Sequence, residues 1–89
     1  MEEVTKKLME HLKEELEDVQ EYHEMALEAE KHGHIRKARN LEKISMEEFT
    51  HAKYIRDTLI DAGAYVPEDH AECEEMWHRV RGMLFRKYR

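Results

Sequence analysis

The segment EYHEMALEAEKHGHIRKARNLEKI, residues 21–44, decides the fold because it contains the break between two long helical patterns. Upstream of the break, residues 4–31 contain neither glycine nor proline. Apolar side chains recur there at steps of three and four residues, at Leu8, Leu12, Val19, Tyr22, Ala26 and Ala29. This spacing predicts one long amphipathic helix. Gly33 is suited to the left-handed residue that closes a helix, so we expect a short turn and an antiparallel second helix.

The second helical pattern covers residues 35–62 and ends at Gly63. Its apolar stripe consists of Ala38, Leu41, Ile44, Ala52, Ile55 and Leu59. Each of the two helices would be about 28 residues and roughly 40 Å long, which is the scale of a four-helix bundle. Pro67 is suited to the first turn of a third helix over 68–87. The stripe of this helix is Cys73, Met76, Trp77, Val80, Met83 and Leu84.

These patterns predict an all-α fold with one domain. Residues 1–62 form a helical hairpin, and residues 63–89 form a linker and a C-terminal helix. A chain of 89 residues buries only a modest core of its own. We therefore expect a partner chain or a metal ion to contribute to its stability.

Composition excludes several classes of function. The formal charge of -6, from 21 acidic and 15 basic residues, argues against binding of nucleic acids. No window reaches the roughly 18 apolar residues of a membrane span, and residues 1–7 lack the layout of a signal peptide. The single cysteine, Cys73, rules out an internal disulfide and a thiolate cluster for iron. We expect a cytoplasmic protein that contacts neither nucleic acid nor membrane.

Two glutamates lie inside the apolar stripes. At about 100° of rotation per residue, the apolar residues of the first stripe lie within about 60° of Glu15. In the second stripe, the residues within about 40° of Glu48 are Leu41, Ile44, Ala52, Ile55 and Leu59. An ionised carboxylate left unpaired in a helical core costs several kcal/mol, so it needs a proton, a cationic partner or a metal ion. No arginine falls in the middle of either stripe. We therefore interpret Glu15 and Glu48 as metal ligands.

His51 strengthens this interpretation because it follows Glu48 by three residues and lies next to it on the same helix face. A ligand set of carboxylates and imidazole, without thiolate, suits iron or manganese, with zinc as a substitute. A second Glu-x-x-His pair, Glu75 and His78, lies about 150° from the centre of its stripe. We expect this second pair to face water and to bind no metal.

The segment around these residues resembles the rubrerythrin and bacterioferritin branch of the ferritin-like superfamily. The resemblance covers residues 8–62 and rests on Glu15, on Tyr22 seven residues later, and on the segment EEFTHA, residues 47–52. It implies that Glu15 is a terminal iron ligand, that Glu48 bridges two irons and that His51 is the nitrogen ligand. Tyr22 would form a hydrogen bond near the metals.

The chain departs from this family in having only half of the usual ligand set. Members of the family continue with two more helices that bear another glutamate and another Glu-x-x-His pair. A symmetric dimer would supply both, and encapsulated ferritins are similar in forming their metal sites across a subunit interface. The resemblance thus implies a homodimer or a larger even-numbered oligomer, in the cytoplasm or inside a protein compartment. The third helix would cap the bundle or join dimers.

The expected function is that of a di-iron protein in iron oxidation and handling or in peroxide reduction. Because the chain has no cysteine ligands for an electron-transfer iron, a peroxidase cycle would need an external electron donor. One alternative is a non-enzymatic helical interaction module with a structural or empty metal site. Another is a monomer in which the third helix covers the face that bears Glu15 and Glu48.

Overall fold

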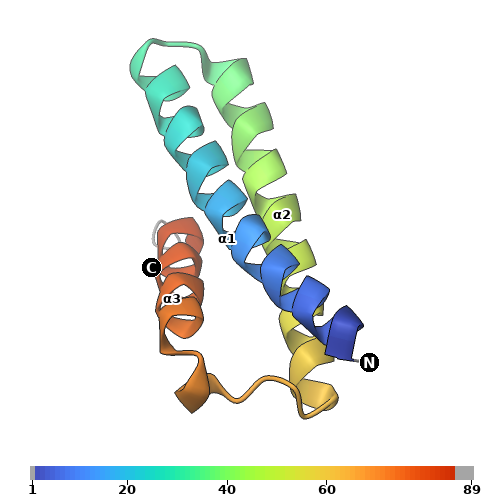
Figure 1. Ribbon diagram of the computed structural model, residues 1–89. Coiled ribbons are helices and arrows are strands. Elements are labelled where there is room, and N and C mark those ends of the chain that lie inside the picture. The colour runs from blue at the N-terminus through green and yellow to red at the C-terminus, as the bar shows by residue number, and fades with distance from the viewer. Residues whose placement is uncertain (1, 86–89) are drawn as a thin grey trace.

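The computed structural model describes residues 2–85, which form three α-helices and one 3-10 turn. Helix α1 spans Glu2–Lys31, α2 spans Ile35–Asp61 and α3 spans Ala71–Phe85, with the 3-10 turn at Pro67–Asp69. No strand occurs between residues 2 and 85. Helices α1 and α2 form a long antiparallel hairpin, and the shorter α3 lies beside the half of it that is remote from the turn (Figure 1). The predicted all-α class is confirmed.

The hairpin turn follows from the position of Gly33. Its φ of 78° lies in the left-handed region, where a side chain would be strained. The N–H of Gly33 donates to the carbonyl of Glu30 at 2.9 Å, and the N–H of His34 donates to that of Ala29 at 2.9 Å. These two bonds form a Schellman motif, which ends α1 and turns the chain back. Gly63, with a φ of 70°, ends α2 in the same way.

The third helix starts later than the prediction of residue 68. Pro67 does begin a helical turn, but this turn is 3-10 and ends at Asp69. His70 then adopts a φ of -127° and a ψ of 49°, which no α-helix accommodates. Its ring stacks on Tyr65 with centroids 4.8 Å apart, so a tertiary contact holds it outside the helix. The predicted end at Lys87 lies outside the described residues.

The core lies where α3 packs on the hairpin. The predicted stripe of α3 is confirmed, because Trp77, Val80 and Leu84 are buried and the other members are half-buried. From α1 and α2 the core receives Leu12, Leu16, Val19, Phe49, Ala52 and Leu59. Phe49 stacks on Trp77 with ring centroids 4.7 Å apart. Leu16 and Phe49 lie about 100° around their helices from Glu15 and Glu48, which places α3 to one side of the hairpin.

A polar contact ties the start of α3 to α2. Arg56 donates two hydrogen bonds to Glu74, from Nε to Oε2 at 3.0 Å and from Nη2 to Oε1 at 2.8 Å. The hydroxyl of Tyr65 also donates to Glu74 Oε2, at 2.6 Å. The bonds from Arg56 lower the pKa of Glu74 below its ordinary value of 4.5, in spite of its partial burial. Their stabilising effect is therefore full above pH 4.5 and is lost as pH falls through the lowered pKa.

Replacing Glu74 should weaken the docking of α3. We expect Glu74→Ala to lower the free energy of unfolding by about 2 kcal/mol, between the values for surface and fully buried pairs. The reason is that Arg56 would remain half-buried without its partner. Urea unfolding at pH 7 measures this loss. The neighbouring Glu75→Ala is the control, since Glu75 is exposed; an equal loss in both variants would contradict the assigned role.

Candidate metal centre

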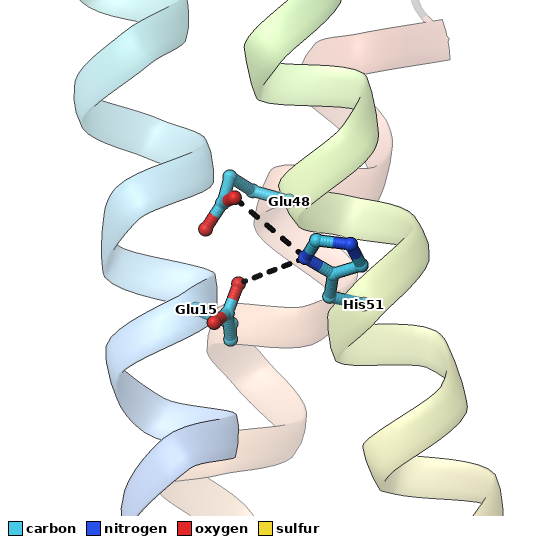
Figure 2. Close-up of side chains that lie close together, drawn as sticks. All are labelled: Glu15, Glu48 and His51. Atoms are coloured by element: carbon cyan, nitrogen blue, oxygen red, sulfur yellow. Dashed lines mark ion pairs between the residues drawn. The ribbon is translucent and has the colours of Figure 1, made fainter.

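The structure brings together the three predicted ligands Glu15, Glu48 and His51. Glu15 projects from the middle of α1, and the other two project from α2 toward it (Figure 2). One ligand atom from each lies within 4.8 Å of the other two. His51 Nδ1 is 3.8 Å from Glu15 Oε2 and 3.7 Å from Glu48 Oε1. Two atoms that bind one ion at roughly 2.1 Å each can lie up to about 4.2 Å apart, so His51 could share an ion with either glutamate at these spacings.

The pairing of α1 with α2 aligns these side chains. Ser45 is completely buried, and its hydroxyl donates to the backbone carbonyl of Val19 at 2.8 Å. Ser45 and Val19 lie about one turn from Glu48 and Glu15 on the same helices. This hydrogen bond therefore fixes the register of the two helices next to the glutamates. A shift by one turn would separate Glu15 from His51.

The carboxyl group of Glu15 lies in an environment that disfavours its charged form. Its side chain is 22% exposed, but its Oε2 atom is buried and accepts no hydrogen bond. Burial, followed by the proximity of the Glu48 carboxylate and the charge of Asp18, raises the pKa of Glu15 to about 7. A buried acceptor without a partner costs about 1 to 3 kcal/mol. A proton or a metal cation at this position would remove that cost.

The cluster lies on the face of the hairpin opposite to α3. In Figure 2 the three side chains lie in front of α1 and α2, whereas α3 crosses behind them. His51 is 60% exposed on this open face. The arrangement in which the third helix covers the Glu15 and Glu48 face is therefore wrong. The physical reason is that α3 packs on Leu16 and Phe49, which point to the other side.

Tyr22, Glu75 and His78 are the other residues for which the sequence predicts a position relative to the metal site. Tyr22 is half-buried on α1, two turns from Glu15 and on nearly the same face. It forms no hydrogen bond within residues 2–85, so its expected role near the metals stays a prediction. Glu75 and His78 are exposed on α3, as predicted, and His78 Nε2 lies 3.6 Å from Glu74. The pair contributes to no ligand cluster among the described residues.

Two polar pairs that connect the helices were not predicted from the sequence. His23, which carries no predicted role, is only 15% exposed, and its Nδ1 lies 3.1 Å from Glu42 Oε1 across the hairpin. Arg56 and Glu74 were not singled out either. The antiparallel register gave a signal for the first pair, because residues whose numbers sum to about 65 lie opposite one another. The sequence gives no comparable rule for which residues of α3 lie opposite those of α2, so the Arg56–Glu74 pair had no such signal.

Comparison of the chain with family models, with curated proteins and with solved structures found no match. Membership of the ferritin-like superfamily therefore stays a prediction that rests on the residues themselves. Among the described helices, none combines the length and the apolar character that a membrane crossing requires.

The raised pKa of Glu15 predicts the pH dependence of metal-free stability. The folded carboxyl keeps its proton up to about pH 7, whereas the unfolded one loses it near 4.5. The contribution of this group to stability therefore decreases as pH rises between these values, by on the order of 3 kcal/mol. Glu15→Gln should remove this decrease and raise stability at pH 8. Urea unfolding with chelator from pH 5 to pH 8 measures both effects.

The control for this prediction is Glu10→Gln, an exposed position on the same helix. It should keep the pH dependence of the parent protein. A Glu15→Gln variant that is less stable than the parent at pH 8 without metal would show that the carboxylate is not costly.

Proposed function

We propose that this chain is a di-iron carboxylate protein that acts in iron oxidation and handling or in peroxide reduction. The metal centre would be shared by two copies of the chain. The observation that supports this proposal is the buried Oε2 of Glu15, which accepts no hydrogen bond and lies beside Glu48 and His51. A bound cation would be a closer partner for this oxygen atom than the His51 nitrogen at 3.8 Å.

The chemistry of the donor set fits iron. Glu15 and Glu48 offer carboxylate oxygens and His51 offers an imidazole nitrogen, and no sulfur atom belongs to the cluster. Such a mixture is typical of iron and manganese sites, with zinc as a substitute. Within residues 2–85, one chain offers only these three groups, which leaves two ions far short of ligands. A second set of the same groups would complete a paired site of the kind found in di-iron helical bundles.

The open face of the hairpin supports a second copy as the source of these groups. Tyr22, Ile44 and Ile55 lie within about 40° of Glu15 or Glu48 on their helices. All three are half-buried, and Val4, near the same line of α1, is 57% exposed. Two such faces packed about a two-fold axis would form a four-helix bundle with Glu15 on two helices and the Glu48/His51 pair on the others. Helix α3 would stay outside this bundle.

The residues of the proposed centre would influence proton release and access of iron, and the composition of the chain bears on the source of electrons. Two bound ferrous ions would together supply the two electrons that convert peroxide and two protons to water. Because the pKa of Glu15 lies near 7, its proton leaves when a cation binds. His51 is the exposed ligand, so cations would approach past it. Cys73 is the single cysteine, so a peroxidase cycle would take its electrons from an external donor.

Iron content and molecular mass test this proposal together. Protein reconstituted anaerobically with Fe(II) should bind two irons per pair of chains and should have the mass of a dimer or larger oligomer. Glu48→Ala should lose the iron and the iron-dependent rise in melting temperature, because a ligand is gone. The double variant Glu75→Ala/His78→Ala is a matched control, since it removes the same residue types at the same spacing from an exposed face.

The outcomes separate the two candidate functions. Oxygen or peroxide consumption with carboxylate-bridged diferric absorption supports the oxidoreductase. Bound iron in a dimer that consumes neither oxidant indicates a helical interaction module with a structural metal site. A chain that stays monomeric with iron, or a Glu48→Ala variant that binds as much iron as its parent, contradicts the proposed centre.

A further inference from the structure

A hollow of about 400 Å³ lies between α1, the 3-10 turn and α3. Three of the side chains that line it contain sulfur: Met9 of α1 and Cys73 and Met76 of α3. The imidazole of His70 also lines it. All four are half-buried, so each can contact a ligand in the hollow without unfolding of the chain. Met9, Cys73 and Met76 are three of the seven sulfur-containing residues of the chain, which are one cysteine and six methionines.

We propose that this hollow binds Cu(I), or a comparably soft monovalent cation, through the sulfur atoms of Met9, Cys73 and Met76. His70 is the fourth donor. Thiolate and thioether ligands select Cu(I) over the harder divalent cations, and imidazole is compatible with it. Binding replaces the S–H bond of Cys73 by a Cu–S bond and releases one proton, with no change of oxidation state.

The mobility of the donors suits an ion much smaller than the hollow. His70 is held by stacking on Tyr65 at 4.8 Å, and Tyr65 is in turn fixed by its hydrogen bond to Glu74. The methionines are unbranched and have three rotatable side-chain bonds, so their sulfur atoms can close on an ion. A rigid imidazole and two adaptable thioethers thus line the same hollow as the thiol. Met9 and Met76 pack against the core and also line the hollow.

The charges around the hollow favour a cation over an anion. Asp69 and Glu72 line it together with one basic residue, Lys13. The amide groups at the start of α3 would attract an anion, but the first turn of that helix already contains Glu72 and Glu74. The long side chain of Lys13 can direct its ammonium group into solvent. The net charge of the lining side chains is therefore negative when His70 is neutral.

This site differs from the proposed iron centre in place and in chemistry. The iron centre uses oxygen and nitrogen donors on the open face of the hairpin, whereas the sulfur donors lie at the seam of α1 with α3. Neither set shares a residue with the other. Loss of Glu48 should therefore leave Cu(I) binding unchanged, and loss of the sulfur atoms should leave iron binding unchanged.

Competition with bicinchoninate, a coloured Cu(I) chelator, tests the proposal under anaerobic conditions. The full chain should remove one Cu(I) per molecule from the chelator. Cys73→Ser and the double variant Met9→Leu/Met76→Leu should each lower the affinity at least about tenfold, since even the loss of a group that only orients a metal ligand costs roughly 10- to 100-fold. Leucine conserves the volume of methionine, so the fold should persist. Far-ultraviolet circular dichroism checks this.

Two controls define the outcomes. Met25→Leu removes an exposed methionine that does not line the hollow and should keep the affinity of the parent. Glu48→Ala should also keep it. No transfer of Cu(I) to the parent protein would overturn the proposal. So would a double methionine variant that binds as tightly as the parent, because that result would assign binding to the thiol alone.

Discussion

The carboxylate of Glu15 imposes the main constraint on this structure, because one of its oxygen atoms is buried at the seam of α1 and α2 without a hydrogen-bond partner. The helices cannot separate to hydrate it, since the Ser45 bond to Val19 and the buried Ala52 hold them together nearby. The chain therefore tolerates a local cost in order to keep two carboxylates and an imidazole at one place. Such a cost is typical of residues retained for binding, and not of residues retained for stability.

The contacts that stabilise the fold and the proposed metal site lie on opposite faces of the hairpin. On one face, α3 buries Trp77, Val80 and Leu84, and Arg56 and Glu74 bind across the seam. On the other face, the ligand cluster and half-buried apolar residues remain uncovered. Two helices alone could not enclose a core, so α3 provides the apolar contacts that the acidic face lacks. This division lets one short chain present a costly site while remaining folded.

The features that could be predicted from the sequence depend on the angular positions of residues around a single helix. The stripes and Gly33 located α1 and α2, and the same rotation placed Glu15, Glu48 and His51 on facing sides. The features that were not predicted, which are the start of α3 and the side on which it packs, depend on contacts between segments that are distant in the sequence. The stacking of His70 on Tyr65, which delays the start of α3, joins residues on either side of a proline. Likewise, Leu16 and Phe49 enter the core because α3 packs on the side of the hairpin that bears them, and the predicted stripes included neither residue.

The pKa of Glu15 also bears on how the proposed dimer would form. In a single chain near pH 7, this carboxyl is protonated about as often as it is ionised, which limits the cost of its burial. A second copy would bring another Glu15 and another Glu48 to the same place and exclude more water. Like charges at such short range oppose association unless protons or cations neutralise them. In the proposed dimer, metal binding and pairing of the chains would therefore be thermodynamically coupled, so that each would strengthen the other.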